Sequence, residues 1–408
     1  MSRCDVAIIG AGLAGLAAGA LLAHAGKRVV LADAEQAAGG ILAGHEEAGL
    51  LFNAGLPVVF GLGTGGVARL RKTLGLSEEP RLLPASYQVA LPDRRVTVLP
   101  EREATLEELR REFPRDIDSL ASLFREMQDL ARAIENRKIT SAFVRWRSAA
   151  GVLRKRRFSA QCIAYFDVQA RSFFGRTIEE LPLREFVELI DSRPAVLEGG
   201  IPELVCELRE AFERRGGELL LGEPWPVIAT PTKRLKEVQF STQSLEARSF
   251  LVNLPEANQG PVLFLETDAE VIPVGMQDAV LCLPDYAKPQ ALTVITLDQD
   301  RRTSAGEKGS RALTASFSGG SAPQDHESAL RSLQNIMPFL DQFTVRSMVR
   351  GDEDRKTWGA ALQDAWVPYR RTAMRINRSV RNVYAVPDQL LGIKLSLEAA
   401  VAAAAHVR

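Results

Sequence analysis

Residues 5–33, DVAIIGAGLAGLAAGALLAHAGKRVVLAD, have the pattern of a strand, a glycine turn, a helix and a second strand. Residues 6–9 form a short apolar run of the kind found in buried parallel strands. In the G-x-G-x-x-G motif that follows, the first glycine allows a tight turn and the second lets backbone N–H groups reach a diphosphate. The third lets the helix lie close to the strand. We therefore predict that a dinucleotide diphosphate binds at this helix N-terminus, on Gly10, Ala11, Gly12, Leu13, Ala14 and Gly15.

An acidic residue stands where such a cofactor would present its ribose. Residues 29–32 predict the second strand, and Asp33 follows at its carboxyl end, about 20 residues beyond the motif. A carboxylate there accepts hydrogen bonds from ribose hydroxyls and disfavours a 2′-phosphate, so NADP is not expected. The alternative is a plain α/β unit in which the glycines serve only packing. The combination of strand, helix and acid favours a dinucleotide-binding fold.

The next segment indicates which dinucleotide is bound. Gly39 and Gly40 come soon after Asp33, and LLFNAGLPVV (residues 50–59) predicts a strand that contains Gly55. This run resembles the flavoprotein family of amine oxidases and phytoene desaturases, where paired glycines follow the acid and a later glycine lies near the flavin. The resemblance implies FAD as the cofactor, with Gly39, Gly40, Ile41 and Gly55 at its site. The family usually has arginine where this chain has Ile41, and glutamate where it has Asp33.

Two further stretches resemble the same family. VALPDRRVTVLP and the later FPRDIDSL are similar to the phytoene desaturase branch, where a β-hairpin leads to a helix ending in F-P and then to a second long helix. Apolar residues at helical spacing over residues 117–134 predict that this second helix packs against a core. LEGGIPELVCELREAFERRGG resembles the helix that precedes the family's adenosine-binding strand. By this resemblance, the backbone of Val227 contacts the adenine.

In the sequence VYAVPDQLLG, residues 383–386 predict a final parallel strand, and residues 395–407 predict an alanine-rich helix. The family has here a strand, G-D, a turn with a glycine (Gly392 in this chain) and a helix whose N-terminus faces the flavin. The resemblance therefore places Asp388 at the ribityl-diphosphate part of FAD. Pro387 replaces the usual glycine, and its fixed φ and missing N–H restrict backbone approach to the diphosphate. We expect this end of FAD to be held less tightly; the alternative is that Asp388 only caps the helix.

The predicted fold class is α/β, with a Rossmann-like FAD-binding domain of the GR2-type flavoproteins and a mixed α+β substrate domain. A chain of 408 residues exceeds one typical hydrophobic core, which agrees with two domains. We expect the FAD-binding domain to be discontinuous and to comprise residues 1–75, 195–262 and 372–408. Residues 76–194 and 263–371 then form the substrate domain.

Charge and cysteine content exclude several classes of protein. The chain has 51 lysines and arginines and 51 aspartates and glutamates, so no overall positive field favours nucleic acid. Its four cysteines are scattered and it has only four histidines, so no metal site is predicted. Because we find no cleavable leader and no long uncharged apolar run, we expect a cytoplasmic protein.

Residues 137–157, RKITSAFVRWRSAAGVLRKRR, are rich in basic residues and contain no acidic one. Apolar side chains are interleaved with these charges, a composition that suits docking on an anionic membrane surface. In the phytoene desaturase branch that this chain resembles, the corresponding region borders the opening of the substrate channel, which implies that an apolar substrate enters from the bilayer. A solvated surface helix and a docking site for a protein partner are the alternatives.

These expectations converge on an FAD-dependent oxidoreductase that transfers hydride between the flavin N5 and an apolar small-molecule substrate, with an isoprenoid as one candidate. Because the cofactor supplies the reactive centre, a chain poor in histidine can still be an enzyme. One alternative is an amine oxidase. The other is a non-catalytic lipid or prenyl binder, or a member of a larger complex, that retains the fold. No catalytic residue is predicted; residues that could border the flavin, or simply pack or form ion pairs, are Asp364, Trp366, Arg370 and Arg371.

Overall fold

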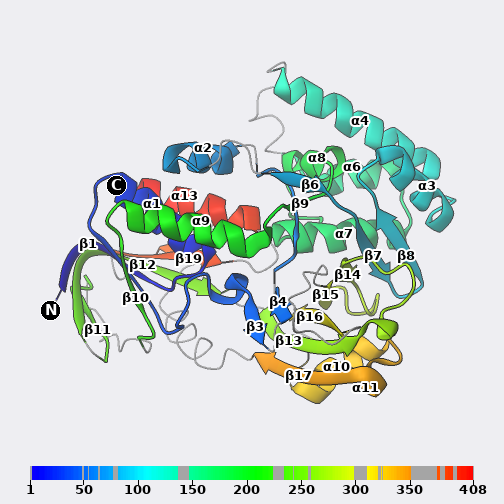
Figure 1. Ribbon diagram of the computed structural model, residues 1–408. Coiled ribbons are helices and arrows are strands. Elements are labelled where there is room, and N and C mark those ends of the chain that lie inside the picture. Colours follow the sequence, from blue (N-terminus) through cyan, green and yellow to red (C-terminus); the bar gives the residue numbers. More distant parts are fainter. Residues whose placement is uncertain are drawn as a thin grey trace.

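Two seven-stranded sheets with helices packed against them organise the protein, as seen in a computed structural model (Figure 1). The structure describes residues 2–47, 50–53, 55–62, 65–76, 81–136, 147–223, 234–241, 243–255, 259–297, 310–319, 323, 325–350, 375–376, 382–388 and 393–407. Statements about structure below concern these residues.

The first sheet has a parallel centre. Its strand order is β10-β2-β1-β12-β19-β18, with β11 paired to β12. The five parallel strands are β10 (Glu218–Leu221), β2 (Val29–Asp33), β1 (Ser2–Ile9), β12 (Ser244–Pro255) and β19 (Val383–Asp388). The antiparallel additions are β11 (Glu237–Gln239) and β18 (Arg375–Ile376). Because β1 lies between β2 and β12, its carboxyl end is at the point where the strand order reverses, where ligands bind in sheets of this kind.

Helices cover one face of this sheet (Figure 1). They are α1 (Leu13–His24), α9 (Gly200–Arg214), α13 (Ile393–Val407) and, beyond them, α2 (Gly65–Leu74). In α1 every residue from Leu13 to Ala23 is buried, which explains why this helix is apolar all round. The strand, turn, helix and strand predicted for residues 5–33 are confirmed, as are the final strand and the alanine-rich helix.

The second sheet is largely antiparallel, with the order β17-β13-β16-β15-β14-β7-β8. Helix α7 (Ala160–Phe174) packs on β7 and β14, while α10 (His326–Gln334) and α11 (Leu340–Phe343) contact β13. The strands are β17 (Thr344–Arg350), β13 (Gln259–Asp268), β16 (Ser310–Ser318), β15 (Leu292–Leu297), β14 (Ala279–Cys282), β7 (Tyr87–Leu91) and β8 (Arg94–Val98). The division into two domains remains a proposal. The proposed boundary at residue 262 falls inside β13, whose described pairing partners, β16 and β17, both belong to the second sheet. We therefore move this domain boundary to a position before Gln259.

The remaining helices form a layer above α7 (Figure 1). The helix predicted from residue 117 is confirmed as α4, whose side chains Leu120, Leu123, Phe124 and Met127 are buried. The β7-β8 hairpin and the helix that precedes Phe113 and Pro114 are also confirmed. The helices of this layer are α3 (Arg102–Glu112), α4 (Ile117–Glu135), α6 (Ala149–Arg156) and α8 (Leu183–Asp191).

The single strand predicted for residues 50–59 is wrong. Two short strands form instead, β4 (Leu50–Phe52) and β5 (Val58–Val59), and they belong to different small sheets. Strand β4 pairs with β3 (His45–Glu47), whereas β5 pairs with β9 (Ala195–Leu197), which also pairs with β6 (Leu82–Pro84). Pro57 lacks an N–H for a strand ladder and Gly55 has no side chain to pack, so the segment bends between the two strands.

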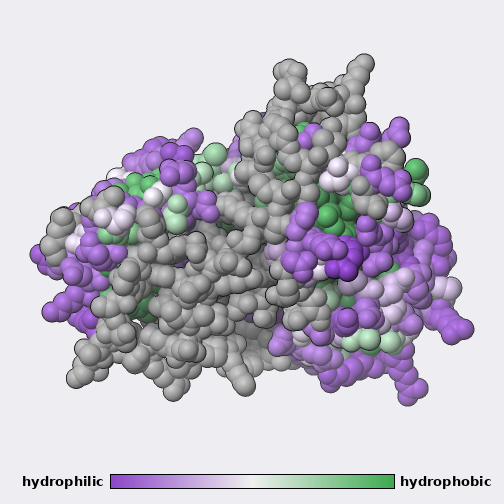
Figure 2. Space-filling model, turned by 90° about the horizontal axis from the view of Figure 1, so that it is seen from below, coloured by the Kyte–Doolittle hydropathy of each residue, from purple (hydrophilic) through white to green (hydrophobic). Residues whose placement is uncertain are grey.

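The basic segment is described only from Arg147 onward; residues 137–146 lie outside the described ranges. Two of its arginines are paired with acids elsewhere in the fold, Arg154 with Glu179 in the turn before α8 and Arg156 with Glu126 of α4. These ion pairs reduce the local charge excess that motivated the membrane interpretation, and docking on an anionic surface or a protein partner remains a proposal. On the face shown in Figure 2, the coloured residues are mostly hydrophilic, with hydrophobic ones in smaller patches between them. Among the described helices, none combines the length and apolar character needed to cross a membrane.

A largely buried ion pair joins α13, on the first sheet, to α8. The Lys394 ammonium donates to both oxygens of Glu188, with Nζ 2.5 Å from Oε2, and the two side chains are only 12% and 15% exposed. Gly61 makes room for this pair, because a Cβ there would lie 1.7 Å from a Glu188 oxygen. The two parts of the molecule are thus connected by charge as well as by apolar packing.

A neighbouring carboxyl, Glu185, makes the stability of the fold depend on pH. Burial raises the pKa of Glu185, and the negative charges of Glu398 and Glu188 raise it further. The positive charges of Arg176, 3.1 Å away, and Lys394 oppose this shift. A raised folded-state pKa means that the stability contributed by Glu185 is fully present below its ordinary pKa of 4.5 and is lost as pH rises through the folded value.

We therefore expect Glu185→Gln, which mimics the protonated carboxyl, to gain stability relative to wild type as pH increases from about 4.5 toward neutrality. Urea denaturation of both proteins across this pH range measures the difference. A wild type whose stability rises in parallel with that of the variant would contradict the assignment.

Candidate cofactor and substrate site

The glycine turn brings three backbone segments into close contact. Gly10 follows β1 with a φ of 102°, and a Cβ there would lie 2.8 Å from the carbonyl oxygen of Asn253 in β12. A Cβ on Gly15 would lie 2.2 Å from the carbonyl oxygen of Gly10. Side chains at these two positions would force the start of α1 away from the sheet. The glycines therefore hold the helix N-terminus at the carboxyl ends of β1 and β12.

The first turn of α1 has no side chain that caps or neutralises it. Its N-cap is Gly12, which has no side chain to bond the first N–H groups, and its first turn contains no acidic residue. The N–H groups of Leu13, Ala14 and Gly15 and the positive end of the helix dipole are therefore left without a capping side chain or an acidic neighbour in this turn. This arrangement suits a diphosphate.

Asp33 lies at the end of β2 and is 2% exposed. Its Oδ2 accepts a hydrogen bond from the Ala11 N–H at 2.5 Å, and its Oδ1 accepts one from the Glu35 N–H at 3.0 Å. An ionised carboxylate has about four acceptor positions, so each oxygen can still accept a ribose hydroxyl. The carboxylate thus links the glycine turn to the expected ribose position.

The paired glycines that follow Asp33 also lie at this turn. The Gly39 N–H donates to the Ala11 carbonyl oxygen at 2.6 Å, and Gly39 forms a parallel bridge with Gly12. Gly39 has a φ of 108°, and a Cβ there would meet a methyl of Val205 at 2.5 Å. Gly40 begins the short 3-10 helix η1 (Gly40–Ala43), which includes Ile41. The structure therefore brings these predicted residues together.

The structure describes only some of the other residues that were predicted to bind FAD or to border the flavin. Asp388 is the last residue of β19 and stands opposite Pro255 of β12, so the strand ends at the same edge as the glycine turn. Gly55 is buried between β4 and β5. Val227 and Gly392 lie outside the described residues, as do the four candidates between 364 and 371. One buried residue at this edge was not predicted: Asn253, whose Nδ2 donates to the Val386 carbonyl oxygen at 2.9 Å.

We expect Asp33→Ala to weaken FAD binding by about 1–3 kcal/mol, because the exchange leaves the N–H groups of Ala11 and Glu35 and the ribose hydroxyls without their acceptor. Titration of the apoprotein with FAD, followed by flavin fluorescence, measures this loss. Asp5→Ala is a matched control, since Asp5 accepts from the Arg28 N–H at the opposite end of the sheet. Equal FAD affinity in Asp33→Ala and wild type would contradict the assignment.

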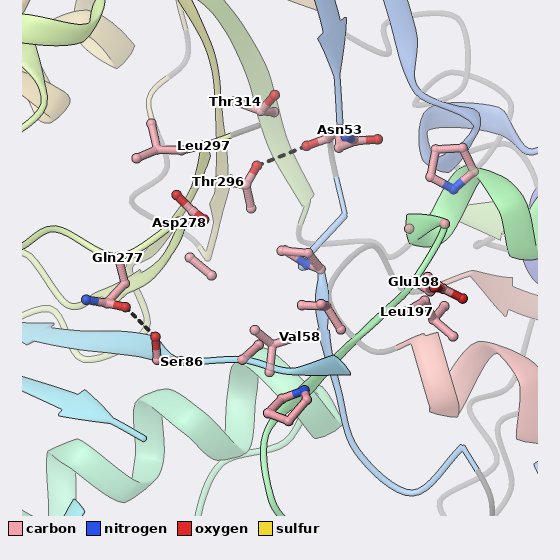
Figure 3. A pocket seen from close by; sticks show the side chains of 18 of the residues that line it. Asn53, Val58, Ser86, Leu197, Glu198, Gln277, Asp278, Thr296, Leu297 and Thr314 are labelled. Carbon is pink, nitrogen blue, oxygen red and sulfur yellow. Dashed lines mark hydrogen bonds between the residues drawn. The ribbon is translucent and has the colours of Figure 1, made fainter. Parts of the chain in front are cut away.

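A cavity of about 480 Å³ lies where the first sheet's connections meet the second sheet (Figure 3). Polar side chains come mainly from β15, β16 and the segments that precede β7 and β14. Apolar side chains come mainly from β4, β5, β9 and the start of α9. The apolar side includes Leu51, Pro57, Val58, Val196, Leu197 and Pro202; the polar side includes Ser86, Gln277, Asp278, Thr296 and Thr314. The cavity thus has two walls of different character.

Several polar groups of the cavity are joined to one another. The Thr296 hydroxyl donates to the Asn53 carbonyl oxygen at 3.0 Å, and the Ser86 hydroxyl donates to Gln277 (Figure 3). The carboxylate of Asp278 lies 3.6 Å from Arg311, and a second lining carboxylate, Glu198, lies 3.3 Å from Arg81. No sequence motif marks these residues, because the pairing of distant strands brings them together.

The parallel sheet, the uncapped helix start and the buried acid define a nucleotide-binding fold that fits the ADP half of FAD. The family described as flavin containing amine oxidoreductase matches residues 13–255, more than half of the chain, and the chain belongs to this family. The protein is an FAD-dependent oxidoreductase, and the predictions of family, fold class, enzyme and cofactor are confirmed.

Individual relatives agree with this assignment. Over 135 residues the chain is 31% identical to one of the subunits of limonene dehydrogenase from Castellaniella defragrans, a match that spans 32% of this chain and 24% of that protein. An oxidoreductase from Methanosarcina mazei has a TM-score of 0.57 at 16% identity, covering 96% of this chain and 98% of its own. Cyclohexylamine oxidase from Brevibacterium oxydans has a TM-score of 0.54 at 15% identity, and the match covers 99% of this chain and 98% of that enzyme's chain. Both structures share the fold with this chain.

Proposed function

We propose that this oxidoreductase acts on an apolar, isoprenoid-like substrate held in the cavity beside the second sheet. The observation that carries the proposal is the aliphatic and proline wall, formed by residues such as Val58, Leu197 and Pro202. Among the lining residues that the structure describes, none is aromatic and none is a lysine or arginine. A hydrocarbon skeleton gains roughly 25 cal/mol for each Å² of apolar surface that this wall covers.

Two similarities support the same substrate class. The curated relative named above is part of an enzyme named for limonene, an apolar terpene. The β7-β8 hairpin and the α3-α4 helices also resemble the phytoene desaturase branch of the family. When bound, FAD supplies a hydride acceptor or donor at N5, and the cavity walls exclude water and orient the substrate carbon toward it.

Amine oxidation is the second candidate, favoured by the carboxylates of Asp278 and Glu198 at the cavity. A carboxylate can hold a substrate ammonium, and the matched family takes its name from amine oxidoreductases. Both carboxylates, however, already lie within ion-pair distance of an arginine. This pairing reduces their attraction for a further cation.

Anaerobic mixing of the FAD-loaded protein with substrates distinguishes the two candidates. We expect terpenes and terpene alcohols to bleach the oxidised flavin absorbance, and primary amines of similar size to leave it unchanged. A Leu197→Asp variant should lose terpene-dependent bleaching while retaining bound FAD, because a charge in the apolar wall opposes a hydrocarbon. Bleaching by amines alone would favour amine oxidation and overturn the proposal.

A further inference from the structure

Two threonines stand side by side on the wall of the cavity. Thr296 of β15 and Thr314 of β16 are directly opposite each other in the antiparallel ladder, so their side chains lie on the same face of the sheet. Their next neighbours in this row are Phe264 of β13 and Ala279 of β14. The row therefore presents two hydroxyls between apolar groups. Both threonines are well buried, at 5% and 2% exposure.

The two hydroxyls differ in their hydrogen bonding. Thr296 donates to the Asn53 carbonyl oxygen at 3.0 Å, which joins the sheet to the segment after β4. Within the described part of the chain, the Thr314 hydroxyl makes no side-chain hydrogen bond, although it lies in the cavity wall. Because Thr314 lines the cavity, a bound molecule with a hydrogen-bonding group could bond this hydroxyl.

The surrounding groups indicate which chemistry would satisfy Thr314. Ser86 and Gln277 bond to each other, and Asp278 and Glu198 each lie beside an arginine. An ammonium would need an uncommitted carboxylate, whereas a neutral oxygen needs only a donor such as a threonine hydroxyl. The opposite wall is aliphatic. The arrangement therefore matches a molecule with an apolar body and one neutral oxygen function.

We propose that Thr314 is a specificity-determining residue that binds the hydroxyl or carbonyl oxygen of an otherwise apolar substrate. The inference rests on the proposed function in one respect, that the cavity is the substrate site. It goes further by naming the substrate class, an oxygenated rather than a purely hydrocarbon isoprenoid. Thr296 acts alongside it as a structural residue that fixes the position of the wall.

The test uses the FAD-loaded protein and two ligands that differ by one hydroxyl, limonene and perillyl alcohol. Their dissociation constants are measured from perturbation of the flavin spectrum, separately from any turnover. We expect wild type to bind the alcohol roughly tenfold more tightly than the hydrocarbon, since a tenfold difference corresponds to about one good hydrogen bond. Thr314→Val should remove this preference and leave limonene binding unchanged.

Thr293→Val is the matched control, because Thr293 is a buried threonine of β15 that does not line the cavity. It should retain the preference for the alcohol, and the melting temperature of each variant checks that it is folded. Equal binding of both ligands by wild type, binding of neither, or an unchanged preference in Thr314→Val overturns the inference. If the preference depends on Thr314 but neither ligand bleaches the flavin, the inference stands and the proposed function fails.

Discussion

Replacing Gly15 with alanine is expected to abolish stable FAD binding and to destabilise the fold by about 3 kcal/mol. The added Cβ would lie 2.2 Å from the Gly10 carbonyl oxygen, a contact with backbone that a side-chain rotation cannot relieve. The start of α1 must then move away from β1, with the strain typical of an overpacked core. The same movement displaces the N–H groups that face the diphosphate. Flavin content after purification and urea denaturation of the apoprotein measure the two effects.

The control for this exchange is Gly151→Ala. Gly151 is the third residue of α6, as Gly15 is of α1, but a Cβ on Gly151 would meet only the Ser148 hydroxyl at an ordinary 3.6 Å. Alanine is the better helix former, so this variant should be as stable as wild type or up to about 1 kcal/mol more stable. Normal flavin content in Gly15→Ala would show that close helix approach is not required, and would overturn our account of the glycine turn.

Replacing Lys394 is expected to lower the free energy of unfolding by a similar amount, because it leaves a buried charge without its partner. Lys394→Met leaves the Glu188 carboxylate largely buried without its cation, and breaking such a pair typically costs about 3–5 kcal/mol. Because both side chains are partly hydrated, we expect about 3 kcal/mol in the free energy of unfolding, measured with urea. The exposed pair of Arg209 and Glu213 on α9 gives the control, since Arg209→Met should change stability by less than about 0.5 kcal/mol.

A double variant tests whether the pair itself is responsible. Glu188→Leu combined with Lys394→Met removes both charges and should recover most of the loss, because apolar residues of similar size can replace a buried ion pair. Additive losses in the double variant would show that the two side chains act independently. Such a result would remove the ion pair from the account of how α8 and α13 are held together.

The cofactor half of the site could be predicted from sequence because its signals are local. Gly10, Gly15 and Asp33 lie within one strand, helix and strand unit, and hydrogen bonding within that unit fixes their geometry. The paired glycines lie a short distance further along the chain. The family resemblance predicted them at the cofactor, whereas their contact with Ala11 was seen only in the structure.

The substrate half could not be predicted in the same way. Thr296 and Thr314 come from different strands, and only the register of β15 against β16 sets them side by side. A register shift of one residue would turn them to the opposite face, and single threonines in apolar strands carry no signal of which face they occupy. Residues 50–59 show the same limit, because a run of apolar residues did not reveal that β4 and β5 join different sheets.

The order of strands in the first sheet also affects how the protein can form during synthesis. Its central strand, β1, is complete when residue 9 has left the ribosome, but β12 and β19 follow only after residues 244 and 383 have been added. Helix α13, which packs on α1, is made later still. A nascent chain that stops short of these segments leaves apolar strand edges and the face of α1 exposed, a condition that favours aggregation or chaperone capture. We therefore expect this fold to take up FAD only after β19 and α13 have been made.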